Sequence, residues 1–463
     1  MKHGVLITVI TLMLISSCIL INADRTLAEE NYDPSPDPPP ITDEYGRQLI
    51  LRGCNYPGLE YGGFNHRPED LEQMASWGFN VVRLPIAWAY LEPEPDVWDE
   101  TYLTDHVLPS VQWAADAGLY VILDMHQWKW SPCCDGNGIP AWTCEGGVSG
   151  DFCFIYESGV FWDHPEYLDH FVQAWAMVAS FFAGDERIIA YDLWNEPTAG
   201  LRSFPWTSEN QLYRPLFIRF IEAIRAIDPD RRLIVEPTIL NSTGFFSWVM
   251  DPLPYEQLIY EPHVYPGFCA IEGIGYWVGP EFLRSDIQQR FAESKKAGLP
   301  LFVGEFGIGY LEQGAADFAH DSYLFLDEVM AHAAWWSYGR DDGMALLFPD
   351  GAEKPGFLNS VDRPYPQVTA GRLQSFGFDQ EEKIFTVRFR NISFMAPEIF
   401  IYIPAKRHWP DGFIVNSTDR AGYWSWKFYS TESILHVHAD PEAAEHEITV
   451  QRKTLACRET HDN

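Results

Sequence analysis

Side chains that can act as acids or bases, or bind a ligand, close a series of short apolar runs along this chain. The set consists of Arg83, Asp124, His126, Gln127, Asn195, Glu196, His263, Tyr265, Glu305 and Trp336. Taken one at a time, such residues are usually solvated loop residues, core histidines or structural ion-pair partners. Their appearance at the ends of successive runs favours one site built from all of them.

Glu196 and Glu305 are the two residues of this set whose pairing points to a reaction. Hydrolysis of a glycosidic bond needs one protonated carboxyl group for the leaving oxygen and one ionised carboxylate that attacks or activates water. An apolar run precedes each Glu, so partial desolvation raises the pKa of one, while hydrogen bonds and Arg83 keep the other ionised. Retention of configuration requires the two groups to stand about 5 to 5.5 Å apart.

The elements that position these residues alternate between apolar runs and longer helical patterns. We expect strands near residues 49–55, 80–85, 120–126, 188–196, 233–237, 258–263, 301–306 and 333–338. Several helical patterns close on a glycine, which tolerates the left-handed conformation at a helix end; these are Gly78, Gly118, Gly184 and Gly298. Eight such units predict an α/β fold, a (β/α)8 TIM barrel with its site at the carboxyl ends of the strands. The absence of a GxGxxG motif after the first strand argues against a dinucleotide site.

The pattern changes near Val368 to short alternating runs, such as 384–389 and 398–403, with a turn at 410–412. This pattern is typical of a C-terminal antiparallel β-sandwich domain. We therefore divide the chain into a signal peptide or N-terminal anchor (1–28), a Pro-rich linker (29–40), the catalytic barrel (41–365), the sandwich (366–457) and a polar tail (458–463).

The first residues carry an export signal, because Lys2 and His3 precede an apolar run that extends from Val5 to Ile21. The chain is expected to be secreted or extracytoplasmic. Residues 15–18 also resemble a bacterial lipobox, so anchoring through the uncleaved run or through a lipidated Cys18 stays open. Host organism and glycosylation are left open as well.

Export also predicts disulfide bonds among the remaining cysteines. Four of these lie between Cys133 and Cys153 in a Gly-rich stretch, with no CxxC pair that would favour zinc. The sequence does not define the pairing. The balance of 66 acidic against 32 basic residues, a net charge of −34, makes nucleic acid a poor partner.

Four fragments resemble glycoside hydrolase family 5 of clan A, and the resemblance covers nearly all of the mature chain. They are Leu193–Pro197, Val303–Gly307, Asn80–Pro85 and Glu261–Pro266. The resemblance implies that Glu196 is the acid/base and Glu305 the nucleophile. It further implies that Asn195 contacts the sugar 2-hydroxyl, that His263 and Tyr265 support the carboxylates, that Arg83 steadies the nucleophile, and that Trp336 lies under the cleaved sugar.

Within this family the chain is most similar to the endoglycoceramidases. The similarity lies in Ile50–Asn55, Leu123–Gln127, the passage from Arg363 to Gly371, and the fragments Pro397–Ile399 and Trp409–Gly412. One departure is Trp128, where the resemblance leads us to expect an acidic residue after His126 and Gln127. The tryptophans of the following loop, Trp130, Trp142 and Trp162 together with Trp128, could stack on sugar rings or pack on one another.

The leading hypothesis is therefore a retaining glycosidase, a hydrolase that cleaves the β-glycosidic bond between a glycan and a ceramide. An endo-β-1,4-glucanase or β-glucosidase on the same scaffold is the alternative, and a non-catalytic glycan- or lipid-binding protein is an alternative of another class. This chemistry needs no metal and no other cofactor. We expect a carbohydrate or glycolipid substrate, transient contact with a membrane or micelle, no nucleic acid, and a monomer.

Overall fold

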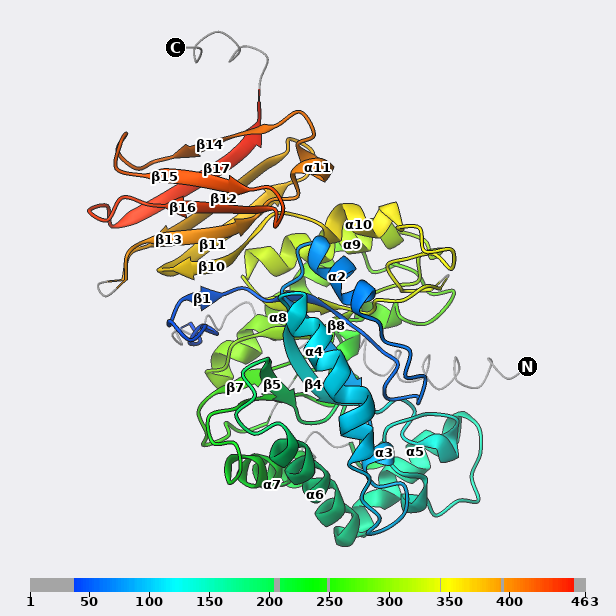
Figure 1. Ribbon diagram of the computed structural model, residues 1–463. Helices are drawn as coiled ribbons and strands as arrows, with labels where there is room; N and C mark the ends of the chain where they lie inside the picture. Colours follow the sequence, from blue (N-terminus) through cyan, green and yellow to red (C-terminus); the bar gives the residue numbers. More distant parts are fainter. Residues whose placement is uncertain (1–36, 204–208, 248–249, 342, 393–394, 454–463) are drawn as a thin grey trace.

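The computed structural model describes residues 37–203, 209–247, 250–341, 343–392 and 395–453. The predicted signal or anchor (1–28), Cys18, most of the linker, Cys457 and the polar tail lie outside these ranges. The described chain forms a barrel of strands surrounded by helices and, beside it, a smaller part made of antiparallel sheets (Figure 1).

Eight parallel strands form the barrel, in the order β7-β6-β5-β4-β3-β2-β9-β8. Parallel bridges from Tyr260 to Leu301 and from Val264 to Phe306 join the two outer strands of this order and close the ring. The predicted (β/α)8 barrel is thereby confirmed. The strands are β2 (Arg52–Asn55), β3 (Val81–Ile86), β4 (Tyr120–Met125), β5 (Ile188–Asp192), β6 (Arg232–Val235), β7 (Leu258–Tyr260), β8 (Phe302–Phe306) and β9 (His332–Trp335).

Helices cover the outside of the barrel because each has one apolar face. In α7, for example, Leu216, Phe217, Phe220, Ile221 and Ile224 are buried at helical spacing. The longer helices are α2 (Pro68–Ser76), α4 (Leu108–Asp116), α5 (Asp151–Val160), α6 (Pro165–Phe181), α7 (Arg214–Arg225), α8 (Gly279–Ala297), α9 (Ala315–Glu328) and α10 (Pro355–Val361), and the four-residue helices are α3 (Trp88–Leu91) and α11 (Ala405–His408).

The predicted helix-ending glycines adopt left-handed backbone conformations. The φ angles of Gly78, Gly118, Gly184 and Gly298 are 81°, 80°, 69° and 70°. A residue with a Cβ rarely adopts such angles, so these glycines stop each helix and turn the chain toward the next strand.

The first predicted strand, 49–55, is in fact divided between the two parts of the molecule. Only Arg52–Asn55 enters the barrel as β2, whereas Gln48–Leu49 forms the short strand β1, which pairs with β10 of the sandwich. The sequence prediction was wrong here because one apolar run serves two sheets. Several predicted strands also end earlier than expected, so Glu196 lies in the loop that follows β5.

The C-terminal part consists of two antiparallel sheets, with strand orders β1-β10-β13-β16-β15 and β11-β12-β17-β14. Alternate side chains of their strands pack into a shared apolar core that includes Phe385, Val387, Ile399 and Leu435. The strands are β10 (Tyr365–Ala370), β11 (Arg372–Asp379), β12 (Ile384–Arg390), β13 (Glu398–Tyr402), β14 (Phe413–Ser417), β15 (Ser425–Tyr429), β16 (Ile434–His438) and β17 (Glu445–Arg452).

Polar contacts join the sandwich to the barrel. The Tyr365 hydroxyl donates to the Gly78 carbonyl at 2.6 Å, and the Tyr402 hydroxyl donates to Asp362 at 2.8 Å. Because these groups are buried, the two parts are held in a fixed register at this surface. Within the described ranges, no helix is both long and apolar enough to span a bilayer.

Candidate active site

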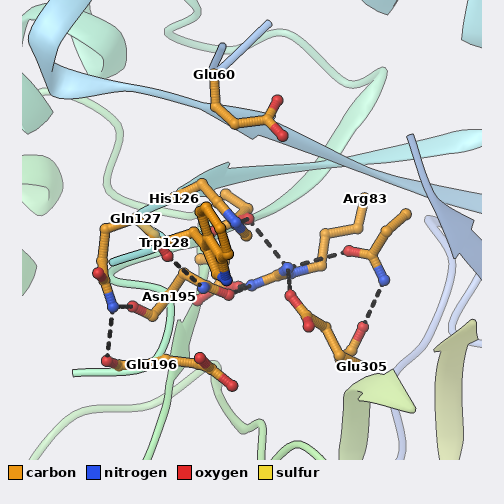
Figure 2. A network of polar contacts seen from close by, with 12 residues as sticks. Glu60, Arg83, His126, Gln127, Trp128, Asn195, Glu196 and Glu305 are labelled. Carbon is orange, nitrogen blue, oxygen red and sulfur yellow. Dashed lines mark hydrogen bonds and ion pairs between the residues drawn. The ribbon is translucent and has the colours of Figure 1, made fainter. Parts of the chain in front are cut away.

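The residues singled out in the sequence gather at the carboxyl ends of the barrel strands (Figure 2). One carboxylate oxygen of Glu196, one of Glu305 and a ring nitrogen of His263 all lie within 4.8 Å of one another. This spacing fits the separation of about 5 to 5.5 Å that a double-displacement mechanism requires. A single sugar can therefore meet both carboxyl groups.

Glu196 lies in a turn that the surrounding residues hold in place. Its φ of 45° falls in the left-handed region, which non-glycine residues rarely adopt and which is enriched at functional sites. Its amide donates to Glu236 at 2.8 Å, and its carbonyl accepts a hydrogen bond from Gln127 at 3.0 Å. These bonds fix the direction of the carboxyl group, which lies 3.0 Å from Nδ1 of His263.

The electrostatic surroundings of Glu196 suit a proton donor. Burial raises the pKa of this carboxyl group to about 7, against the lowering effect of His126 and Arg83. Burial also lowers the pKa of His263 to about 4, so its imidazole is neutral at neutral pH. A carboxyl group with such a pKa can hold a proton near neutrality and still release it.

Glu305 occupies a different environment, because two donors hold its oxygens. Arg83 Nη1 lies 3.1 Å from Oε1, and the Tyr265 hydroxyl donates to Oε2 at 2.9 Å. Both contacts fix the direction of the carboxylate oxygens. Gly304, directly before Glu305 in β8, leaves room for the Glu261 side chain. A Cβ at this position would lie only 1.5 Å from Oε1 of Glu261.

Arg83 is the centre of the site, and its side chain is fully buried. Five carboxyl groups lie within 3.1 Å of its guanidinium: Asp124, Asp192, Glu236, Glu261 and Glu305. Burial acts to lower the pKa of Arg83, but these carboxylates outweigh it and raise the pKa well above its usual value. Arg83 is therefore charged at all accessible pH values.

One positive charge cannot neutralise five buried negative ones. Burial and the neighbouring acids raise the pKa of Asp124, which reaches about 7, and also those of Asp192, Glu236 and Glu261. These carboxyl groups therefore bind protons more readily than exposed ones do. Arg83 is the cation that they share with Glu305, the carboxylate that also contacts Tyr265.

His126 and Trp336 form one wall of the site. The two rings stack with their centroids 5.5 Å apart and an interplanar angle of 10°. Asp124 lies 2.7 Å from Nδ1 of His126 and fixes the ring orientation. Trp336, joined to Ser337 by a cis peptide bond, is half-buried and offers an aromatic face on which a sugar ring can lie.

Asn195 and Gln127 are both buried, and the protein itself uses their side chains. Asn195 accepts a hydrogen bond from Arg83 at 2.9 Å and donates to the Gln127 carbonyl at 3.0 Å. Gln127 donates to the Glu196 carbonyl and accepts from the Trp130 amide. Gln127, predicted as a substrate-binding residue, is thus positioned to hold the acid/base turn.

Sequence reasoning missed several acidic residues of this site. Asp192, Glu236 and Glu261 end or directly follow β5, β6 and β7, so the rule that selected Glu196 could have found them. Asn55 at the end of β2 was missed as well, although it accepts from Arg83 at 3.0 Å. Glu60 lies in the loop after β2, where no pattern marks it.

The cysteine-rich loop carries two disulfide bonds, Cys133–Cys144 and Cys134–Cys153. The predicted structural disulfides are thereby confirmed, and Cys54 and Cys269 are buried free thiols. Most of the loop tryptophans pack within the protein, since Trp130 contacts Phe161 and Trp142 contacts Trp88. Trp128 instead is half-exposed.

A closed barrel that brings two carboxyl groups together at its carboxyl face, beside a buried arginine, has the arrangement that a glycoside hydrolase needs. The sequence agrees with this class. Residues 42–342 match the family model described as cellulase (glycosyl hydrolase family 5), and residues 363–450 match the glycoside hydrolase family 5 C-terminal domain. The chain therefore belongs to glycoside hydrolase family 5, and it is a glycosidase.

Among characterised proteins the chain is similar to endoglycoceramidases. It is 27% identical over 419 residues to endoglycoceramidase I of Rhodococcus hoagii (strain 103S), covering 81% of this chain and 80% of that one. It is 24% identical to an endoglycoceramidase of Hydra vulgaris, with 82% of each chain covered. The solved structure of endo-glycoceramidase II from Rhodococcus sp. with a five-membered iminocyclitol has a TM-score of 0.78 at 27% identity, over 90% of this chain and 100% of that chain.

Proposed function

We propose that this glycosidase cleaves β-glycosides by double displacement, with Glu305 as nucleophile and Glu196 as acid/base. The observation that carries the proposal is the approach of the Glu196 and Glu305 oxygens to within 4.8 Å. Glu305 attacks the anomeric carbon while the proton of Glu196 passes to the leaving oxygen. Glu196 then takes a proton from water, which displaces Glu305 and restores the starting state.

The neighbouring side chains support this sequence of steps. The Tyr265 hydroxyl and Arg83 stabilise the Glu305 carboxylate before attack, and neutral His263 beside Glu196 adds no positive charge that would draw its proton away. Asn195 is the candidate for contact with the sugar 2-hydroxyl. Trp336 and His126 would form the wall against which the ring rests.

We further propose that the aglycone is a ceramide. Both parts of the chain, barrel and sandwich, are matched in the endoglycoceramidases to which it is similar, and endo-glycoceramidase II has been solved with ganglioside GM3. Exposed apolar side chains support a lipid-facing rim. They stand on loops that follow barrel strands, on the same side as the catalytic pair: Tyr61, Trp128, Leu201, Trp277 and Leu311.

The decisive experiment incubates the purified protein with a glycosylceramide in detergent micelles and, in parallel, with a soluble β-1,4-glucan. We expect free ceramide and an intact glycan from the first, both identified by mass spectrometry. The Glu305→Gly variant serves as the control for contaminating activity. Cleavage of the glucan with no release of ceramide would refute the proposed aglycone while leaving the catalytic pair in place.

An endo-β-1,4-glucanase is the second candidate, because the family model carries the description cellulase and the chain is 24% identical to cellulase/esterase CelE of Acetivibrio thermocellus over 67% of its length. That match covers only 36% of CelE. The endoglycoceramidase hypothesis is preferred because the similarity to endoglycoceramidases includes the sandwich as well.

We also propose that the protein is exported and acts as a monomer in transient contact with a membrane or micelle. The two disulfide bonds fit an oxidising compartment. The apolar rim would rest on a lipid surface. Fractionation of the native host, with and without lipase or detergent extraction, distinguishes a released from an anchored protein.

A further inference from the structure

Glu60 is a buried carboxyl group of the barrel mouth that the mechanism above does not use. It lies in the loop after β2, and only 1% of the residue is exposed. Figure 2 shows Glu60 apart from the hydrogen-bonded network around Arg83. Its Oε2 accepts a hydrogen bond from the Gly58 amide at 2.8 Å.

The loop is shaped to hold this carboxyl group in place. Gly58 has a φ of 144°, and a Cβ there would lie 3.1 Å from Nε2 of His66. Glycine therefore allows the turn whose amide bonds Oε2. A carboxyl group that only filled space would not need a donor placed beneath it.

The other oxygen of Glu60 is left for a ligand. Oε1 is buried and has no partner in good hydrogen-bond geometry within the described ranges. The Tyr61 hydroxyl approaches closely enough to lower the pKa of Glu60, but outside that geometry. None of the ion pairs found in the described chain involves Glu60. A buried acceptor without a donor costs free energy, and a hydroxyl of a bound molecule would remove that cost.

Electrostatic neighbours place Glu60 beside the catalytic centre. Burial raises its pKa to about 7, and the largest opposing influence is His126, the ring that stacks on Trp336. The pKa of Tyr61 is raised by burial, then by Glu60, and also by Glu305. Tyr61 therefore lies within electrostatic reach of both Glu60 and the Glu305 nucleophile, and Figure 2 shows both carboxyl groups in one close view.

We propose that Glu60 is a specificity-determining residue that accepts hydrogen bonds from the hydroxyl groups of the sugar held between Glu196 and Glu305. A carboxylate can accept from two adjacent hydroxyls, which selects for their number and orientation. The residues after β4, His126, Gln127 and Trp128, include no acid, so Glu60 provides the acidic contact on this side. The proposal rests on the proposed glycosidase mechanism but not on the ceramide aglycone.

The test measures kcat/KM of wild type, Glu60→Ala and Glu60→Gln on an aryl β-glucoside and on its 3-, 4- and 6-deoxy analogues. At pH 8, where the Glu60 carboxyl group is mostly ionised, we expect Glu60→Ala to lose about tenfold to hundredfold on the complete sugar, because a hydrogen bond to a charged group is broken. On the deoxy analogue that lacks the bonded hydroxyl, wild type and variant should be nearly equal. Glu69→Gln, an exposed carboxyl group on α2, is the matched control and should behave as wild type.

A structural role would give a different result. In that case Glu60→Ala would lose activity equally on every analogue, and its melting temperature would fall at neutral pH. Equal losses on all sugars, or no loss on the complete sugar, would overturn the proposal. A wild type that cleaves the aryl glucosides but releases no ceramide would refute only the proposed aglycone.

Discussion

The centre of the barrel mouth and the core of the sandwich are equally well buried, but they are built from opposite kinds of side chain. The sandwich core consists of residues such as Phe385, Val387 and Leu435, whose burial stabilises the fold by the hydrophobic effect. The mouth contains Arg83 surrounded by five carboxyl groups. Such a buried ionic cluster contributes little net stability, since desolvation offsets the attraction. Burial serves stability in the sandwich and sets proton affinities in the barrel.

The largest effect should follow from removing the nucleophile, which tests the functional side of this contrast. Glu305→Gly should lower the rate of hydrolysis by roughly 10⁴-fold or more, because no other group can form the covalent intermediate. An activated 2-fluoro sugar should label the wild type at Glu305, as detected by peptide mass spectrometry. Label on another residue would contradict the assignment.

The next largest effect concerns the proton donor. Because Glu196 must be protonated and its pKa lies at about 7, the rate on a substrate with a poor leaving group should fall as pH rises through about 7. Glu196→Gln should lose about 10²- to 10⁴-fold on that substrate, and this alkaline decline should disappear. Rates measured from pH 4 to 9 check both points. An unchanged decline in the variant would assign the titration to another group.

A substitution in the sandwich core should separate stability from catalysis. Leu435→Ala removes a fully buried side chain and should cost about 2 to 5 kcal/mol of unfolding free energy. The value of kcat below the melting temperature should stay near that of wild type, since Leu435 lies in the separate sandwich core. Urea unfolding and initial rates measure the two quantities. A large fall in kcat of the folded variant would show that the sandwich shapes the site.

Removal of metal ions should have no effect on the rate, which makes it the smallest of the expected changes. Glu196, His263 and Glu305 present ligand atoms within 4.8 Å of one another, a spacing that a metal site would also show. In the proposed mechanism Glu196 is instead the acid/base, Glu305 is the nucleophile, and His263 is a neutral side chain beside Glu196. Dialysis against EDTA should therefore leave the rate unchanged. Loss of activity that zinc restores would change the interpretation of the whole mouth.

Much of this arrangement could be predicted from the sequence, because a parallel barrel brings the ends of its strands to one face. Arg83, Glu196 and Glu305 were selected by that rule, and the structure brings them together. The rule could not find Glu60, since a loop residue without periodicity carries no positional signal. The same rule could not predict the disulfide pairing, because disulfide partners depend on distances within a loop rather than on spacing along the chain.

The strand β1 has a consequence for how the chain can be divided. Residues 48–49, which precede the whole barrel in sequence, form the outer strand of the five-stranded sheet beside β10. A fragment cut after about residue 362 would keep β1 without its sheet, and a fragment that began there would leave the free edge of β10 open to other chains. The sandwich thus contains chain segments from before and after the barrel, and we expect neither part to fold stably without the other.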